Sequence, residues 1–412
     1  MHIISIYPDK NWFLNIIKDV KVNDLPNDMI QTLESIITKC FDDYDLILIN
    51  YELEVIYQLS WERINFGMFK DVPLIWRKIF ALSCLLITFV NIKLSKDLDL
   101  GLLKRCLYLC DMSLMMGGEI SKDFNLGALV AKEIHDIITM EAKVIIKTEP
   151  FLSYPNFNPL QNIPDLIKNN LRPLERIQAP SISEFLNILK KSEPIILTNV
   201  ISNWPALSNN LWSVGYIKKV CGFRTVPIEI GSSYAESNWT QKLMTINDFI
   251  ENYFYQSSET DSKAYLAQHY LFSQIAELND DIEIPDYCFM NSTDQKPEID
   301  INGWFGPAGT VSPLHQDPKQ NFLCQVFGEK YVKLYHANQT NYLYPNSTTM
   351  LKNTSKIDVL SPDLETFPLF SNAIGFDCFL KPGEILFIPP KCWHYVTSLS
   401  PSFSVNFWWN YE

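Results

Sequence analysis

The feature that most constrains this fold is a pair of side chains two positions apart, His315 and Asp317, followed 77 positions later by His394. Successive side chains on a β-strand point to opposite faces, so residues i and i+2 point the same way. On one strand, His315 and Asp317 can grip a single ion while Gln316 points away. His394 must then come from a neighbouring strand. A barrel-like β-sandwich provides one, because strands distant in sequence face each other across its narrow interior.

Two imidazoles and one carboxylate form the facial triad that holds Fe(II) and leaves coordination positions open for O2 and a co-substrate. The triplet alone is weak, because a chain of 412 residues with 6 histidines and 47 acidic residues contains such a pattern by chance. Its surroundings add weight, since Trp304 to Leu314 precedes the first ligands and the apolar run from Ile385 precedes His394. These residues predict an iron oxygenase.

Two alternating segments, 321–327 and 330–335, follow the first ligands and meet at Gly328-Glu329, which predicts a β-hairpin. Lys330 begins the second segment, within reach of an acidic co-substrate. A dicarboxylate needs a cation for its distal carboxylate, and a lysine supplies one as a charge-assisted donor. The alternative for Lys330 is an ordinary turn lysine.

The first third of the chain has the apolar spacing of helices, with hydrophobic residues three and four positions apart from about 25 to 148. The clearest stretches are 29–41, 53–59, 76–94, 102–116 and 129–146. The most apolar run, Ile79 to Val90, has 12 residues, short of the ~20 that span a bilayer, so we expect a buried core helix and no membrane partner.

Five prolines between 150 and 173 interrupt this periodicity, and short strand-like segments such as 194–200 and 225–231 follow. The composition therefore predicts an α+β chain in three parts. These are an α-helical domain at 1–150, a linker or wrapping segment at 151–179, and a β-rich catalytic domain at 180–412.

The net charge of −13 argues against direct nucleic-acid binding. It suits basic protein segments, although an acidic surface can equally serve solubility alone. The nine scattered cysteines and the absence of a secretory leader predict reduced thiols in a nuclear or cytoplasmic protein that is not secreted. The oligomeric state is left open.

The stretch from about 180 to 412 resembles a JmjC domain, and the whole chain resembles the JmjC domain-containing protein five group, also called lysine demethylase eight. The strings that carry this resemblance are Tyr265 to His269, Ile284 to Cys288, Trp304 to Pro318, the Gly328 turn, Gly383 to Pro389 and Phe403 to Trp409. The resemblance implies a double-stranded β-helix, the jelly-roll or cupin-like fold.

The resemblance also implies roles for individual residues. Fe(II) ligands are implied at His315, Asp317 and His394. Contacts to the co-substrate 2-oxoglutarate are implied at Tyr265, Ser312, Asn321, Lys330 and Trp408. A site for a protein arginine is implied at Glu229 and Trp239, with Gln268 and Trp304 nearby, and would direct hydroxylation to C3 of the arginine. A carboxylate can bind a guanidinium bidentately and an indole can stack on it.

Three functions remain open at this stage. The first is 3-hydroxylation of arginine in a protein partner. The second is histone lysine demethylation, which would call for a methylammonium pocket and usually accompanies reader modules, whereas no zinc-finger spacing is present. The third is a non-catalytic binding or scaffold protein, against which the intact triad and Lys330 count.

Overall fold

The computed structural model describes residues 3–18, 25, 27–42, 44–68, 71–117, 120–121, 124–142, 159, 161, 163–231, 239–254, 263–290, 297–348 and 351–411. The chain divides into two compact units. Unit 1 consists of Met1–Ile146 with two later segments, Cys221–Val226 and Ser273–Ala276. Unit 2 consists of Lys147–Val220, Pro227–Phe272 and Glu277–Glu412. Each unit has its own hydrophobic core.

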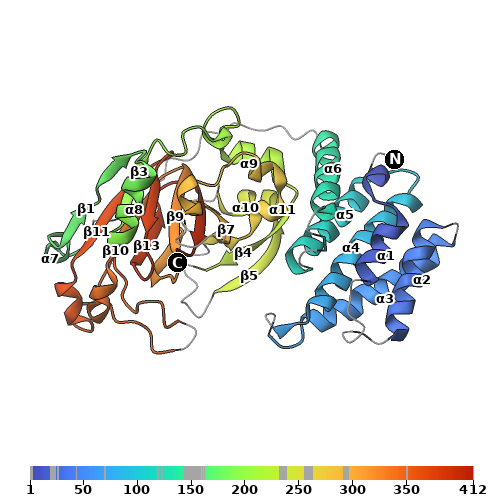
Figure 1. Ribbon diagram of the computed structural model, residues 1–412, viewed down its shortest axis with the longest axis horizontal. Helices are drawn as coiled ribbons and strands as arrows, with labels where there is room; N and C mark the ends of the chain where they lie inside the picture. The colour runs from blue at the N-terminus through green and yellow to red at the C-terminus, as the bar shows by residue number, and fades with distance from the viewer. Residues whose placement is uncertain are drawn as a thin grey trace. The chain divides into compact units, whose positions relative to one another are not determined.

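Unit 1 is an array of helices in which α3 packs on α4, α4 on α5 and α5 on α6 (Figure 1). Its elements are η1 (Ile3–Ile6), α1 (Lys10–Lys18), α2 (Asn27–Phe41), α3 (Leu46–Ile64), α4 (Leu74–Leu94), α5 (Leu100–Met116) and α6 (Leu126–Glu141). Asp45, Asp99 and Asn125 cap the first turns of α3, α5 and α6 by accepting backbone N–H groups. The predicted helical stretches lie in α2 to α6, and residues 143–146 of the last stretch lie outside the described residues.

Helix α4 is the core of unit 1. All residues from 79 to 90 are buried, as predicted, although the helix has 21 residues, nine more than the apolar run. By length and composition the helix could cross a membrane, because its most apolar 18-residue stretch has a mean hydropathy of 1.6. However, 78% of that stretch is buried inside the protein. Burial by α3 and α5 accounts for its apolar surface.

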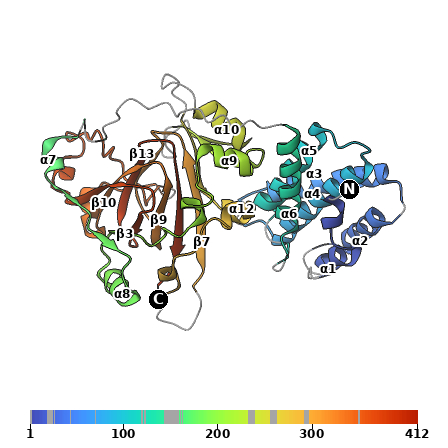
Figure 2. The ribbon, with the colours of Figure 1, turned by 90° about the horizontal axis from the view of Figure 1, so that it is seen from above.

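Unit 2 is built on two β-sheets (Figures 1 and 2). One has the order β1-β11-β10-β13-β8 and the other β2-β3-β12-β9-β14-β7-β6-β4-β5. The strands are β1 (Leu171–Pro173), β2 (Arg176–Gln178), β3 (Ile195–Thr198), β4 (Thr225–Ile230), β5 (Thr240–Thr245), β6 (Ala264–His269), β7 (Ile299–Gly306), β8 (Val311–Gln316), β9 (Gln320–Phe327), β10 (Lys330–Tyr335), β11 (Gly375–Leu380), β12 (Ile385–Ile388), β13 (Trp393–Ser398) and β14 (Ser402–Trp409).

Apolar residues of both sheets meet in one core, to which β9 contributes Leu323, β10 Val332 and Leu334, and β12 Leu386. The helices of unit 2 are α7 (Asp165–Lys168), α8 (Ile182–Lys191), η3 (Pro205–Leu207), α9 (Val214–Cys221), α10 (Ile246–Tyr253), α11 (Leu271–Gln274), α12 (Ala276–Asn279), η4 (Asp286–Phe289), η5 (Ala337–Tyr342) and η6 (Pro368–Asn372). A helical region followed by a β-sandwich confirms the predicted α+β class. Strands β1 and β2 lie in the stretch predicted as a linker or wrapping segment, and the three domain boundaries stay predictions.

The hairpin predicted at Gly328-Glu329 is wrong. Strands β9 and β10 flank these two residues, but β9 pairs with β12 and β14 whereas β10 pairs with β11 and β13. The short link therefore crosses from one sheet to the other. Gly328 has a φ of +70°, and a Cβ there would lie 2.1 Å from the carbonyl oxygen of Pro401, so the sharp corner requires glycine.

Candidate active site

The pairing of β13 with β8 brings the three predicted ligands together. His394 on β13 lies directly opposite His315 on β8. Asp317 is the first residue after the end of β8. Asp317 Oδ2 lies 3.7 Å from His315 Nε2 and 3.5 Å from His394 Nε2. One atom of each residue lies within 4.8 Å of the others, a spacing that suits ligation of one metal ion. The neighbouring-strand prediction for His394 is confirmed.

Hydrogen bonds on the far side of each ring prepare the histidines for this role. His315 Nδ1 lies 2.7 Å from the carbonyl oxygen of Pro313, and His394 Nδ1 lies 3.0 Å from that of Cys392. A carbonyl oxygen only accepts, so each Nδ1 carries the proton and each Nε2 presents a lone pair to the cluster. Burial, and then the neighbouring His315, lower the pKa of His394 to about 4, which keeps its imidazole neutral.

The backbone of Asp317 is fixed by a hydrogen bond, while its carboxylate oxygen Oδ2 is available to bind a metal ion. Its carbonyl oxygen accepts the N–H of Lys391 at 2.7 Å, which joins the end of β8 to the turn before β13. Oδ2 is buried and has no hydrogen-bond partner among the residues that the structure describes. An orphaned buried carboxylate oxygen is costly unless a cation satisfies it. Two imidazole nitrogens and this oxygen fit a divalent metal, and the donor set with open positions suits Fe(II).

A single pocket contains the three candidate ligands and all five predicted co-substrate residues. The residues that line it are Tyr265, Trp304, Ser312, His315, Asp317, Asn321, Leu323, Lys330, Ile388, His394, Val396, Asn406 and Trp408. Thus the five residues predicted to contact 2-oxoglutarate lie with the three ligands and Trp304. Leu323, Ile388, Val396 and Asn406 were not predicted.

Lys330 gives this pocket a buried positive group. Its side chain is 1% exposed, and Nζ donates to the hydroxyl of Tyr265 at 3.1 Å. Burial lowers the pKa of Lys330 to about 7, and it forms no ion pair with any described carboxylate. Burial also raises the pKa of Tyr265, so its hydroxyl stays neutral and can donate to an anion. A buried cation without an anion is completed by an acidic ligand.

The pocket also offers amide and indole groups. Trp304 Nε1 donates to Asn406 Oδ1 at 3.1 Å, and Asn406 Nδ2 lies 3.5 Å from Asn321 Oδ1. Trp408 Nε1 is buried without a hydrogen-bond partner among the described residues, so it is a donor awaiting an acceptor. Together with Lys330 and Tyr265, these groups give the pocket several donors for an acidic ligand.

Asn406 could have been found from the sequence by alternation along its strand. It stands two positions before Trp408 on β14, so the two side chains share a face. The apolar residues Leu323, Ile388 and Val396 carry no such signal, because every strand of a sandwich has similar residues.

Glu229 and Trp239 lie together as a pair. Trp239 Nε1 donates to Glu229 Oε2 at 3.2 Å, and burial raises the pKa of Glu229 while this bond lowers it. Glu229 on β4 lies opposite Tyr265 on β6, which lines the pocket. Neither member of the pair is among the pocket-lining residues, and nor is Gln268, which is exposed with a φ of +47°. The substrate roles of these three residues stay predictions.

Comparison with known proteins agrees with this geometry. The family model of the cupin-like domain matches residues 181–412. The chain is similar to a lysine-specific demethylase 8 of Danio rerio, with 39% identity over 94% of this chain and 96% of the relative. It is also similar to a Jumonji C domain-containing protein 5 of Drosophila melanogaster, with 39% identity over 87% and 86%. A lysine-specific demethylase JMJ30 of Arabidopsis thaliana shares 36% identity over 87% and 86%.

Proposed function

Because the chain belongs to the cupin-like domain family, as a JmjC oxygenase related to lysine-specific demethylase 8 and Jumonji C domain-containing protein 5, we propose that it hydroxylates C3 of arginine side chains in proteins. Fe(II) and 2-oxoglutarate, which the JmjC family implies, would together supply the O2 activation that inserts oxygen into a C–H bond. His315, Asp317 and His394 would hold the metal.

Different pocket residues would bind different groups of the co-substrate. Lys330 and Tyr265 would bind its distal carboxylate through a charge-assisted hydrogen bond and a neutral one. Asn321, Ser312 and Trp408 would donate to its other polar groups. The apolar side chains of Leu323, Ile388 and Val396 would limit the water in the pocket and so strengthen each of these polar contacts.

The observation that carries the arginine assignment is the Glu229–Trp239 pair. Glu229 is a half-buried carboxylate whose only described partner is an indole N–H, and it forms no ion pair with any described cation. A guanidinium satisfies both groups, by bonding to the carboxylate and by stacking on the indole. The strand pairing of Glu229 with Tyr265 supports a substrate site beside the co-substrate.

Lysine demethylation is the second candidate, because the names of two relatives above carry that activity. A trimethylammonium group has no N–H to donate to a carboxylate, so Glu229 could offer it only a charge. The two activities differ in product, since one adds an oxygen to arginine and the other releases formaldehyde from a methylated lysine.

Mass spectrometry of arginine-containing and methyl-lysine peptides tests the proposal. The peptides are incubated with Fe(II), 2-oxoglutarate and the native protein, His315→Ala, Glu229→Gln or the exposed control Glu329→Gln. We expect one added oxygen on arginine, lost in His315→Ala and reduced about 10- to 100-fold in Glu229→Gln, the range for one charged hydrogen bond. Glu329→Gln should match the native protein.

Formaldehyde release with loss of methyl groups, and no oxygen added to arginine, would replace this assignment with demethylation. If the protein retains no stoichiometric metal and does not bind 2-oxoglutarate, the scaffold alternative takes its place.

A further inference from the structure

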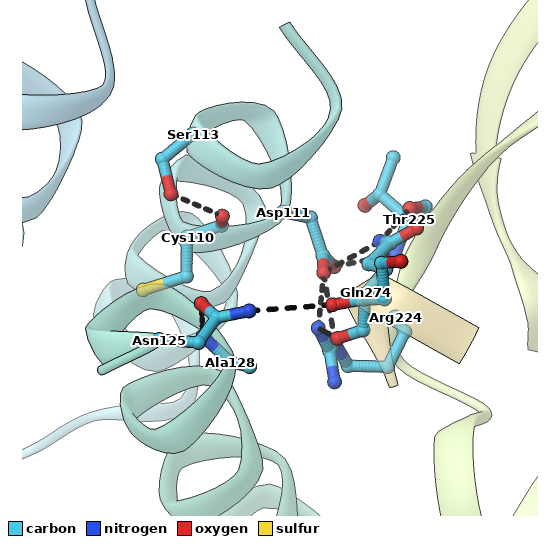
Figure 3. Close-up of polar contacts among 9 residues, drawn as sticks. Cys110, Asp111, Ser113, Asn125, Ala128, Arg224, Thr225 and Gln274 are labelled. Atoms are coloured by element: carbon cyan, nitrogen blue, oxygen red, sulfur yellow. Dashed lines mark hydrogen bonds and ion pairs between the residues drawn. The ribbon is translucent and has the colours of Figure 1, made fainter. Parts of the chain in front are cut away.

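A buried carboxylate of unit 1, Asp111 on α5, binds two segments that come more than a hundred residues later (Figure 3). Oδ1 accepts from Arg224 Nε at 2.8 Å, from Arg224 Nη2 at 2.7 Å and from Gln274 Nε2 at 2.7 Å. Oδ2 accepts the backbone N–H of Thr225 at 2.7 Å. Asp111 is 0% exposed and Arg224 1%, so these bonds form without competition from solvent.

Thr225 is fixed through both of its backbone groups. Its N–H is bound by Asp111, and its carbonyl oxygen accepts from Gln274 Nε2 at 2.8 Å. Arg224 Nη2 in turn donates to the carbonyl oxygen of Gln274 at 2.9 Å, so the two later segments are also bound to each other. Asn125, the N-cap of α6, adds a bond from Nδ2 to the carbonyl oxygen of Ser273 at 3.3 Å.

Thr225 is the first residue of β4, the strand that carries Glu229. Four residues along a strand span about 13 Å, and Thr225 and Glu229 share a face. The registered pairs of β4 with β6 are Glu229 with Tyr265 and Ile230 with Ala264, which lie at the far end of β4. The first residue of β4 lies outside these registered pairs, and its backbone groups are bound by Asp111 and Gln274. Along its other edge β4 neighbours β5, and β6 is paired along its other edge with β7.

We propose that Asp111 is a positioning residue that sets the alignment of β4 and thereby places Glu229 for the substrate. The proposal rests on the proposed function, because it takes Glu229 as the group that binds the substrate arginine. In this proposal α5 supplies the acceptor for the backbone N–H of Thr225, the first residue of β4. Four of the five residues proposed to contact the co-substrate lie on β8, β9, β10 and β14, which form no described contact with Asp111. The fifth, Tyr265, lies on β6, which is also held by its pairing with β7.

The first test is hydrogen–deuterium exchange of the full chain, compared between native protein, Asp111→Asn and Ser113→Ala. Ser113 is a matched control, because it is a buried polar residue two positions along the same helix whose hydroxyl bonds only to the carbonyl oxygen of Cys110 among the contacts described (Figure 3). We expect faster exchange over residues 225–230 in Asp111→Asn alone. If residues 225–230 exchange no faster in Asp111→Asn than in Ser113→Ala, the proposal is overturned, whatever the substrate.

The second test separates positioning from general loss of stability. We expect Asp111→Asn to raise KM for an arginine peptide about tenfold, which suits a displacement of well under 1 Å, with KM for 2-oxoglutarate unchanged. An equal rise in both constants, or no rise in a folded variant, overturns the proposal.

Two further variants guard against misfolding. Asp111→Leu combined with Arg224→Met replaces the ion pair by apolar groups, which restores stability in other buried pairs, yet still leaves the Thr225 N–H without its acceptor. It should keep the raised peptide KM. Asn125→Asp keeps the N-cap of α6 but cannot donate to Ser273, and should raise the peptide KM less than Asp111→Asn.

If the native protein fails to hydroxylate arginine, the proposed function falls, while the exchange comparison still decides whether Asp111 aligns β4.

Discussion

Lys330 Nζ lies 3.1 Å from the hydroxyl of Tyr265, and the two side chains come from strands of different sheets. Lys330 opens β10 in the five-stranded sheet, and Tyr265 lies on β6 in the nine-stranded one. Both side chains line the pocket that also contains His315, Asp317 and His394. The proposed co-substrate site therefore depends on how the two sheets pack as well as on the charge of Lys330.

Replacing Lys330 by methionine should weaken 2-oxoglutarate binding about 10- to 100-fold, because a charge-assisted hydrogen bond contributes roughly 1.5–3 kcal/mol. Isothermal titration calorimetry of the metal-loaded protein measures this. Lys333 is a matched control: it is equally buried on β10, but its Nζ donates to the carbonyl oxygen of Val359 on the other face. Lys333→Met should lower stability and leave co-substrate affinity unchanged. Equal losses in both variants would contradict the role given to Lys330.

The affinity for 2-oxoglutarate should fall about tenfold for each pH unit above about 7, because burial lowers the pKa of Lys330 to about 7 in the absence of an anion. A bound carboxylate favours the ammonium form, so binding takes up a proton in this range. Folding has the opposite slope: the unfolded lysine, with a pKa of 10.5, binds more protons than the folded one, so this group adds stability as pH rises above 7.

Calorimetry in buffers of different ionisation enthalpy measures the proton uptake. Lys330→Arg provides the control, because a guanidinium does not titrate in this range. A pH-independent affinity of the native protein between pH 7 and 9 would mean that Lys330 stays charged in the empty pocket.

The clustering of His315, Asp317 and His394 could be predicted because its geometry is local. His315 and Asp317 need only the alternation of an extended chain, and the strand before His394 reads as an apolar run. The α+β class was also predictable, because helical periodicity ends at a cluster of prolines. The strand with which each segment pairs could not be predicted. The sequence at Gly328-Glu329 suits a hairpin, and only the packing of two sheets explains why β9 and β10 belong to different sheets.

The Asp111–Arg224 ion pair is a second feature that could not be predicted from the sequence. The two residues are separated by 113 positions, and a charged residue on a helix or before a strand is normally exposed. Nothing local signals that Cys221–Val226 and Ser273–Ala276 belong to the same compact unit as the first 146 residues. Such a pairing depends on the tertiary fold, which local patterns do not encode.

Gly306→Ala should weaken 2-oxoglutarate binding through Tyr265. A Cβ at this position would lie 2.7 Å from Tyr265 Cδ2 and 2.8 Å from Thr310 Cγ2. The tyrosine ring must therefore shift, which would disturb its contact with Lys330. We expect a loss of affinity of about tenfold, measured by calorimetry. Gly303→Ala on the same strand is the control, since its Cβ would approach the side chains of Leu271 and Phe403 no closer than 3.3 Å. A similar loss in both variants would point to general damage to β7.

Acid should destabilise unit 1 through His135 on α6, which is 1% exposed. Burial, and then the nearby charge of Arg224, lower the pKa of His135 from 6.5 to about 4. Asp136 raises that pKa and Lys132 lowers it, and the Oδ1 atom of Asp136 lies 3.8 Å from Nδ1, too far for a hydrogen bond. Between pH 6.5 and 4 the unfolded chain binds a proton that the folded one does not, so stability falls with falling pH.

The expected loss in free energy of unfolding from this one group is about 2 kcal/mol between pH 7 and 5. Urea unfolding at the two pH values measures it, monitored by exchange or fluorescence of unit 1. His135→Phe places a ring against Phe223, whose centroid lies 5.9 Å away, and should remove that part of the pH dependence. His336→Gln, at a partly buried site in unit 2, should retain it. If His135→Phe keeps the full slope, acid acts on unit 1 through other groups.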